Sequence, residues 1–193
     1  MAARNETWRV FCAIELPPLV RENISAHIRR LREVTPVSRA SWSRAESVHL
    51  TLTFIGEIAA ERVNLLSQAT QNATASFSSF PIGIGNPGSF PKHGTPRVLW
   101  IGVEDHTGRL AQLQTKLEDE CERIGFKKEA RAFSPHLTIA RLRKAQGARG
   151  LARGHKEMGF EPAKILVSEL LVIRSELSSK GSKYTVISRH ALG

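Results

Sequence analysis

The pattern S-V-H-L-T-L occupies residues 47–52, and the closely similar pattern S-P-H-L-T-I occupies residues 134–139. Each copy places a histidine and a threonine among aliphatic residues of the kind that favour β-strands. A strand that only builds a hydrophobic core has no need of a histidine, and two matched copies call for a functional reason. The repeat therefore predicts two related strands that present the same pair of polar side chains.

Successive side chains of a strand point to opposite faces of its sheet. This alternation places His49, Thr51 and Thr53 on one face of the first strand, with Phe54 among the aliphatic residues of the core face. In the second strand His136 and Thr138 point away from the core, together with Ala140. A solvated strand with a polar outer face would explain one such copy, but it explains two copies poorly.

Two imidazoles and two hydroxyls suit the cleavage of a phosphodiester. The ordinary pKa of histidine, near 6.5, lets one ring accept a proton while another donates one close to neutral pH. Threonine hydroxyls can donate hydrogen bonds to the non-bridging phosphate oxygens. No metal or other cofactor is implied, because one imidazole per strand without a neighbouring carboxylate or thiolate is poor metal-ligand spacing.

The charge of the chain favours a polyanionic partner. The 193 residues carry 28 Lys and Arg against 18 Asp and Glu, a net charge of +10. Residues 141–156 hold six of these basic residues, three glycines and no acid, which indicates a mobile basic loop that contacts substrate. Nucleic acid is the simplest partner, and a surface that only maintains solubility is the alternative.

The cellular compartment is inferred from what the sequence lacks. Its apolar runs are too short for a membrane span or a secretory signal, so we expect a cytoplasmic protein with no membrane partner. Cys12 and Cys121 lie in apolar segments without metal-ligand neighbours, and we interpret both as reduced core residues.

Predicted strands and helices alternate along the chain. Strands are expected at residues 8–16, 48–55, 80–84, 97–103, 135–142, 163–174 and 184–189, helices at 18–32, 59–75 and 107–124, and a Pro- and Gly-rich loop at 86–96. Because a strand and a helix precede each copy of the repeat, we expect residues 1–193 to form one α+β domain with two lobes. Pseudo-twofold symmetry would bring the copies to a shared central groove.

The repeat and its surroundings resemble the two-histidine phosphoesterases, and within them the RNA 2′,3′-cyclic phosphodiesterases, also called 2′-5′ RNA ligases. The segments that carry the resemblance span nearly the whole chain: R-V-F-C-A-I-E-L-P at 9–17, H-L-T-L-T-F-I-G-E at 49–57, P-R-V-L-W-I-G-V at 96–103, F-S-P-H-L-T-I-A-R at 133–141 and G-S-K-Y at 181–184.

The resemblance implies a bilobal fold of two antiparallel sheets with flanking helices, and hydrolysis of a terminal RNA 2′,3′-cyclic phosphate to a 2′-phosphate. It also implies reversible, ATP-independent 2′-5′ ligation of RNA such as tRNA fragments, by a monomer. By the family pattern His49 is the proton donor, His136 is the proton acceptor, and Thr51 and Thr138 contact the phosphate.

Further residues are candidates for substrate binding. Arg141 resembles the basic residue that follows the family's second motif, although strict alternation places it on the core face unless the strand bends. Phe11 and Trp42 are candidates for stacking on a base, and Arg97 and Tyr184 for contacts to phosphate or base. Packing or ion pairing would equally explain these residues. The remaining histidines outside the 86–96 loop, at positions 27, 106, 155 and 190, are interpreted as surface residues.

Two other functions stay open. The first is a phosphodiesterase that acts on small cyclic nucleotides, which the high net positive charge disfavours. The second is an RNA-binding module without catalysis, which the two intact motifs disfavour.

Overall fold

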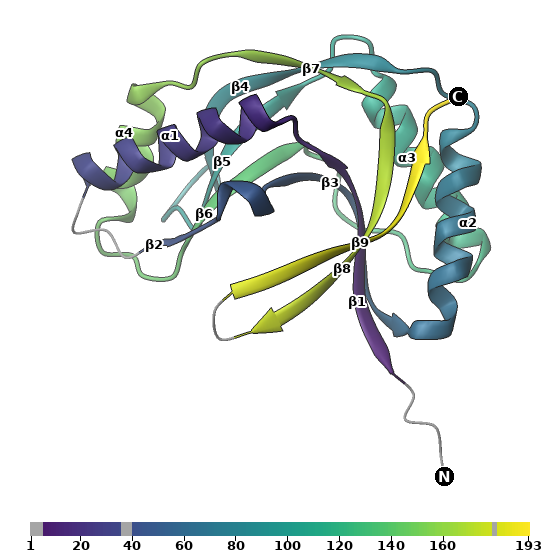
Figure 1. Cartoon of the computed structure of the whole chain (residues 1–193). Helices are drawn as coiled ribbons and strands as arrows, with labels where there is room; N and C mark the ends of the chain where they lie inside the picture. The colour runs from purple at the N-terminus through teal and green to yellow at the C-terminus, as the bar shows by residue number, and fades with distance from the viewer. Residues whose placement is uncertain (1–5, 36–39, 179–180) are drawn as a thin grey trace.

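Two antiparallel β-sheets form the centre of the molecule in the computed structural model, which describes residues 6–35, 40–178 and 181–193 (Figure 1). The first sheet has the strand order β3-β1-β8-β9 and the second has the order β2-β6-β5-β4-β7. The strands of the first sheet are β1 (Thr7–Glu15), β3 (His49–Ala59), β8 (Glu169–Ser178) and β9 (Gly181–Ala191). Those of the second are β2 (Ala40–Trp42), β4 (Phe80–Phe90), β5 (Val98–Glu104), β6 (His136–Leu142) and β7 (Ala163–Val167).

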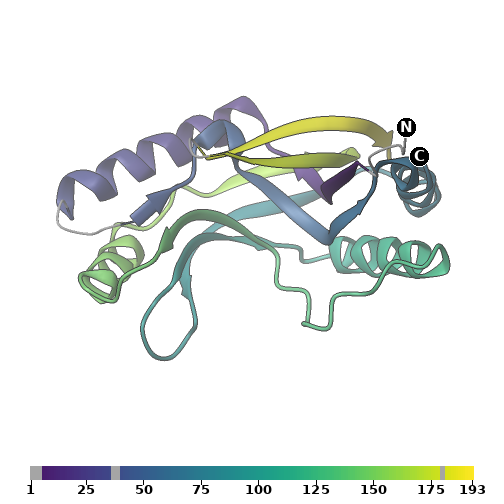
Figure 2. The same cartoon turned by 90° about the horizontal axis from the view of Figure 1, so that it is seen from below.

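Helices flank the sheets on opposite sides of the molecule. Helices α1 (Pro18–Val34) and α4 (Ala148–Met158) lie together on one side, and α2 (Val63–Thr74) and α3 (Arg109–Arg123) lie on the other (Figures 1 and 2). Short 3₁₀ turns at Ala45–Ser47 and Ala60–Arg62 precede β3 and α2. The predicted bilobal α+β fold is confirmed, with one copy of the repeat at the start of a strand in each sheet. No helix of the described ranges has the length and apolar character needed to cross a membrane.

The two lobes share one hydrophobic core. Leu50 of β3 and Leu137 of β6 both belong to a single cluster of buried side chains that also includes residues of all four helices. A smaller cluster of Phe11, Ala13, Leu171 and Ile173 covers the other face of the first sheet. The prediction for Cys12 and Cys121 holds: both thiols are buried, and burial raises the pKa of each to about 12.

Two strand predictions were wrong. The single strand expected at residues 163–174 is two strands, β7 and β8, which belong to different sheets and are separated at Ser168. Both contribute buried aliphatic side chains, and an apolar run carries no signal for a change of sheet. The strand expected at 80–84 continues to Phe90, because a register shift between Gly85 and Pro87 lets the chain pass the proline within the sheet.

The basic segment 141–156 is not the mobile loop that its glycines indicated. Helix α4 occupies most of it, beginning after Gly147, and buries Ala148, Leu151 and His155 along one face. Packing against β4 and α1 outweighs the low helix propensity of its glycines. The basic side chains of Arg149, Arg153 and Lys156 remain exposed.

Three of the histidines interpreted as surface residues are buried, and only the interpretation of His106 is confirmed. His155 Nε2 donates to the carbonyl of Trp100 at 3.0 Å, which leaves its Nδ1 to accept from His27 Nε2 at 2.8 Å. His190 Nδ1 donates to the side-chain oxygen of Gln71 at 3.1 Å. In their neutral form, these histidine rings hold helices against the sheets through hydrogen bonds.

The His27–His155 pair makes the fold sensitive to acid. Burial, followed by the charges of His155 and Arg30, lowers the pKa of His27 to about 4. The unfolded chain therefore takes up a proton below pH ~6.5 that the folded chain refuses until pH ~4, so stability falls as the pH decreases through this window. His27 alone accounts for about 2 kcal/mol between pH ~7.5 and pH ~5.

We predict that His27→Gln, which retains a donor for His155 but cannot titrate, loses less stability over this interval than the parent. Urea unfolding at both pH values measures the difference. Equal losses in the two proteins would contradict an acid-sensitive role for His27.

Candidate active site

Each copy of the repeat contains one residue that its neighbouring strand leaves unpaired. Cys12 and Ala13 of β1 pair with Thr53 and Thr51, so Leu52 has no partner across the strand. In the second sheet Leu99 and Trp100 of β5 pair with Ala140 and Thr138, which leaves Ile139 without a partner. Leu52 and Ile139 occupy the same position in the two copies, so both strands carry an equivalent β-bulge.

The bulges reverse the face on which the following side chains lie. Thr53 and Ala140 are buried, although alternation placed both outward. Phe54 is 42% exposed, which corrects its predicted core position. Arg141 is exposed as well. Its predicted contact with substrate required the strand to bend, and the bulge at Ile139 turns Arg141 away from the core. Phe54 and Arg141 are equivalent positions of the repeat.

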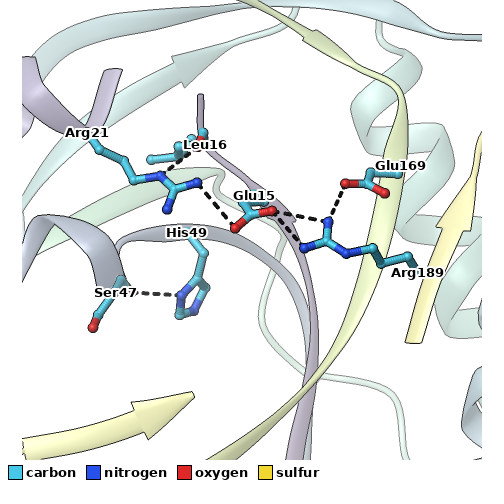
Figure 3. A network of polar contacts seen from close by, with 7 residues as sticks. All are labelled: Glu15, Leu16, Arg21, Ser47, His49, Glu169 and Arg189. Atoms are coloured by element: carbon cyan, nitrogen blue, oxygen red, sulfur yellow. Dashed lines mark hydrogen bonds and ion pairs between the residues drawn. The ribbon is translucent and has the colours of Figure 1, made fainter. Parts of the chain in front are cut away.

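The two motif histidines adopt the same hydrogen-bonded tautomer. His49 Nδ1 donates to the carbonyl of Ser47 at 2.9 Å (Figure 3), and His136 Nδ1 donates to the carbonyl of Ser134 at 2.7 Å. Each bond orients its ring and leaves Nε2 available, as a base when the ring is neutral and as an acid when it is protonated. The matched roles of the two serine carbonyls were not predicted, although both serines belong to the repeated pattern.

The ring of His49 packs against two aromatic side chains, which also contact each other. It stacks on Phe11 with 4.6 Å between ring centroids, and the ring of Tyr184 lies edge-on at 5.0 Å. This burial lowers the pKa of His49 to about 4, in spite of the opposing effect of the Ser47 carbonyl. Tyr184 therefore lies beside His49, and its predicted contact with phosphate or base stays a prediction. Phe11 is only 2% exposed, so its position favours support of His49 over the predicted stacking on a base.

A carboxylate beside His49 is held by two arginines. Glu15 is the cross-strand neighbour of His49, and its two oxygens form ion pairs with Arg21 at 3.2 Å and Arg189 at 3.1 Å (Figure 3). Arg189 also pairs with Glu169 at 2.6 Å. The negative charge of Glu15 is thereby compensated, which is consistent with burial as the leading influence on the pKa of His49.

His136 has its own aromatic neighbours. The ring of Phe90 lies edge-on to it at 5.1 Å, and the indole of Trp100 lies 6.4 Å away. Trp100 in turn covers Gly88, where an added Cβ would lie 2.3 Å from the indole ring. Gly88 is therefore required for this placement. Sequence reasoning missed Phe90 and Trp100 because their contacts depend on the order of strands in the sheet.

Hydrogen bonds join Ser43, in the segment that precedes β3, to the second motif. The backbone N–H of Ser43 donates to the carbonyl of Ile139 at 2.9 Å, and its hydroxyl donates to the carbonyl of Thr138 at 3.0 Å. Strands β3 and β6 also contact each other. The two motifs therefore lie side by side where the sheets meet. Thr51 and Thr138 are half-buried on the same strands.

The other predicted residues divide into two groups. Arg141, Trp42 and Tyr184 come together in the lining of one cavity of about 560 Å³. Arg97 is exposed just before β5 and does not line this cavity. Within the described ranges, no cluster of three or more His, Cys, Asp or Glu side chains is arranged to hold a metal ion.

The fold and the paired motifs together are those of a two-histidine phosphoesterase. The model of the 2′-5′ RNA ligase superfamily matches residues 20–178, and the chain belongs to this family.

Its relatives include proteins named RNA 2′,3′-cyclic phosphodiesterase. One from Escherichia coli is 30% identical over 188 residues, which cover 97% of this chain and 98% of the relative. One from Archaeoglobus fulgidus is 29% identical over 177 residues, which cover 91% of this chain and 96% of the relative. The similarity therefore extends over nearly the full length of these proteins.

Solved structures show the same fold. A Thermus thermophilus protein matches with a TM-score of 0.77 at 25% identity and covers 95% of this chain and 97% of its own. Escherichia coli LigT complexed with 3′-AMP matches with a TM-score of 0.75 at 27% identity, covering 97% and 99%.

We predict that the ring of His49 titrates well below ordinary histidine in the ligand-free protein, at a pKa of about 4. An oxyanion bound against Nε2 favours the charged ring, so inorganic phosphate is expected to raise this pKa. Long-range ¹H–¹⁵N NMR spectra recorded against pH, with and without phosphate, measure both values. His106, which is exposed, is the internal control. An ordinary pKa for free His49 would contradict the proposed desolvation.

Proposed function

We propose that this protein hydrolyses the 2′,3′-cyclic phosphate at the 3′ end of RNA to a 2′-phosphate, with His49 and His136 as the acid and base. The observation that carries the proposal is the equivalence of the two histidines. Each lies on its own bulged strand, donates from Nδ1 to a backbone carbonyl and has an available Nε2. The name shared by the relatives supports this substrate and reaction.

The proposed reaction is an in-line displacement at phosphorus. His136 Nε2 removes a proton from a water molecule, whose oxygen forms a bond to phosphorus as the bond from phosphorus to O3′ breaks. His49 Nε2 gives its proton to the departing O3′, so the product carries a free 3′-hydroxyl and a 2′-phosphate. The hydroxyls of Thr51 and Thr138 donate to the non-bridging oxygens and stabilise their charge. This assignment of the two roles follows the family pattern.

The low pKa of His49 constrains this mechanism. A ring that is neutral in the free protein becomes a proton donor only when the bound phosphate anion stabilises its charged form. Substrate binding and protonation of His49 are therefore coupled, and the donor is charged chiefly in the complex.

The charge of the chain supports RNA as the substrate. The net charge of +10 and the exposed basic side chains of α4 favour a polyanion over an isolated nucleotide. We further propose that residues 1–193 act as one two-lobed domain and as a monomer in the cytoplasm, without a cofactor. The same site would support reversible 2′-5′ ligation of RNA such as tRNA fragments.

Replacing either histidine is expected to abolish most of the turnover. His49→Ala and His136→Ala each remove one proton transfer and should lower kcat by about 10²–10⁴-fold, with RNA affinity largely retained. Thr51→Val and Thr138→Val should be milder, because both proton transfers survive. The assay follows an RNA oligomer that ends in a 2′,3′-cyclic phosphate.

His106→Ala is the matched control, since His106 is exposed and lies outside both motifs. Near-normal turnover by either motif variant would remove that histidine from the mechanism.

Activity is also expected to survive EDTA, and kcat/KM is expected to follow a bell-shaped curve against pH. One limb reports the base becoming neutral and the other the acid losing its proton, and both apparent values belong to the coupled pair. Rates measured across the pH range, with and without chelator, test this prediction. Loss of activity in EDTA with recovery on adding a divalent ion would overturn the two-histidine mechanism.

A further inference from the structure

A cavity with a basic lining adjoins His49. The cavity of about 560 Å³ that contains Arg141 lies between three segments: the approach to β3, the end of β6 and the β8–β9 hairpin. Figure 1 shows this hairpin projecting from the first sheet toward β2. We name the cavity the hairpin pocket. Its lining residues are Ser41, Trp42, Ser43, Arg44, Ser47, Arg141, Arg143, Leu177, Ser178, Gly181, Ser182 and Tyr184.

The lining of the hairpin pocket is basic and rich in hydroxyls. Three arginines contribute to it, and none of its described lining residues is acidic. Among the described residues no carboxylate pairs with Arg141 or Arg143, whereas the arginines beside Glu15 are compensated. Guanidinium groups with neighbouring hydroxyls are the donors that bind a phosphate diester.

The pocket also offers apolar surface. Leu177 is 69% exposed, and Trp42 is half-buried on the strand that pairs with β6. Exposed aliphatic and aromatic side chains next to phosphate-binding groups suit the planar face of a nucleobase. A pocket that combines these two chemistries fits one nucleotide unit with its phosphate better than a free phosphate ion.

The position of the pocket relates it to the direction of the RNA strand. Its lining includes Ser47, whose carbonyl holds His49, and Tyr184, whose ring packs on His49. In the proposed reaction His49 protonates O3′, so the ribose of the terminal nucleotide lies on the His49 side of the phosphorus. The 5′ side of that ribose continues the chain, and the hairpin pocket is the adjoining basic surface.

We propose that the hairpin pocket binds the penultimate nucleotide of the RNA, with Arg44 and Arg143 on the phosphodiester that links it to the terminal nucleotide. This inference rests on the proposed function and deepens it, because it makes an oligonucleotide, rather than a mononucleotide, the preferred substrate. Arg44 and Arg143 are then specificity-determining residues.

The test compares two substrates. Adenosine 2′,3′-cyclic monophosphate has no penultimate nucleotide, whereas the dinucleotide ApA with a terminal 2′,3′-cyclic phosphate has one. The parent protein is expected to show a kcat/KM about tenfold or more higher for the dinucleotide, since a charge-assisted hydrogen bond contributes on that scale. The double variant Arg44→Gln, Arg143→Gln is expected to lower this ratio toward one.

The matched control is Lys127→Gln, Lys164→Gln. It removes the same charge from two exposed residues that do not line the pocket, and it should keep the parental ratio. A general effect of net charge would lower the ratio in both double variants and would overturn the assignment to the pocket.

A binding measurement separates this inference from the proposed function. Fluorescence anisotropy with a labelled ApA that ends in a 2′-phosphate needs no turnover, and its Kd should rise about tenfold in the Arg44, Arg143 variant and stay constant in the control. If neither cyclic substrate is hydrolysed, the proposed reaction fails, while this Kd still decides the role of the pocket. Equal kcat/KM for the two substrates in the parent, or an unchanged Kd in the arginine variant, would overturn the inference.

Discussion

The site depends on one extra residue within each copy of the repeat. Because Leu52 and Ile139 are left unpaired, each strand can bury aliphatic side chains at its start and still direct the later Phe54 or Arg141 outward. An unbulged strand would place Arg141 in the core, where an uncompensated guanidinium is strongly unfavourable. The bulges therefore allow the same two strands to contribute to the shared apolar core and, a few residues further along, to direct side chains outward at the site.

Much of the architecture could be predicted from the repeat, because period-two patterning and strand-forming residues are local signals. His49, Thr51, His136 and Thr138 were located in this way, together with the two-lobed α+β fold. The outward turn of Phe54 could not be predicted, since a bulge is defined by the partner strand. Helix α4 and the buried His27 were missed for a related reason: tertiary packing outweighed glycine-rich composition in the helix and turned a polar ring inward.

The two motif strands have equivalent backbones but carry different side chains after the motif. At equivalent positions of the repeat, the second strand presents the guanidinium of Arg141, whereas the first presents the ring of Phe54, covered by Arg9 at 4.8 Å. The histidines differ less in their bonding than in their surroundings, with Phe11 and Tyr184 around His49 and Phe90 and Trp100 near His136. Duplicated backbone geometry thus places two matched imidazoles, and the side chains around them give the two rings different environments.

The matched Nδ1–carbonyl bonds of His49 and His136 also bear on microscopic reversibility. A catalyst that breaks a bond between phosphorus and an alcohol oxygen must form it again through the same transition state, with each proton donor acting as the acceptor. Within the described ranges no carboxylate forms an ion pair with either ring, and the nearby Glu15 is engaged by Arg21 and Arg189. In the proposed reaction, both rings can therefore exchange the roles of donor and acceptor without changing tautomer, because only Nε2 gains or loses its proton.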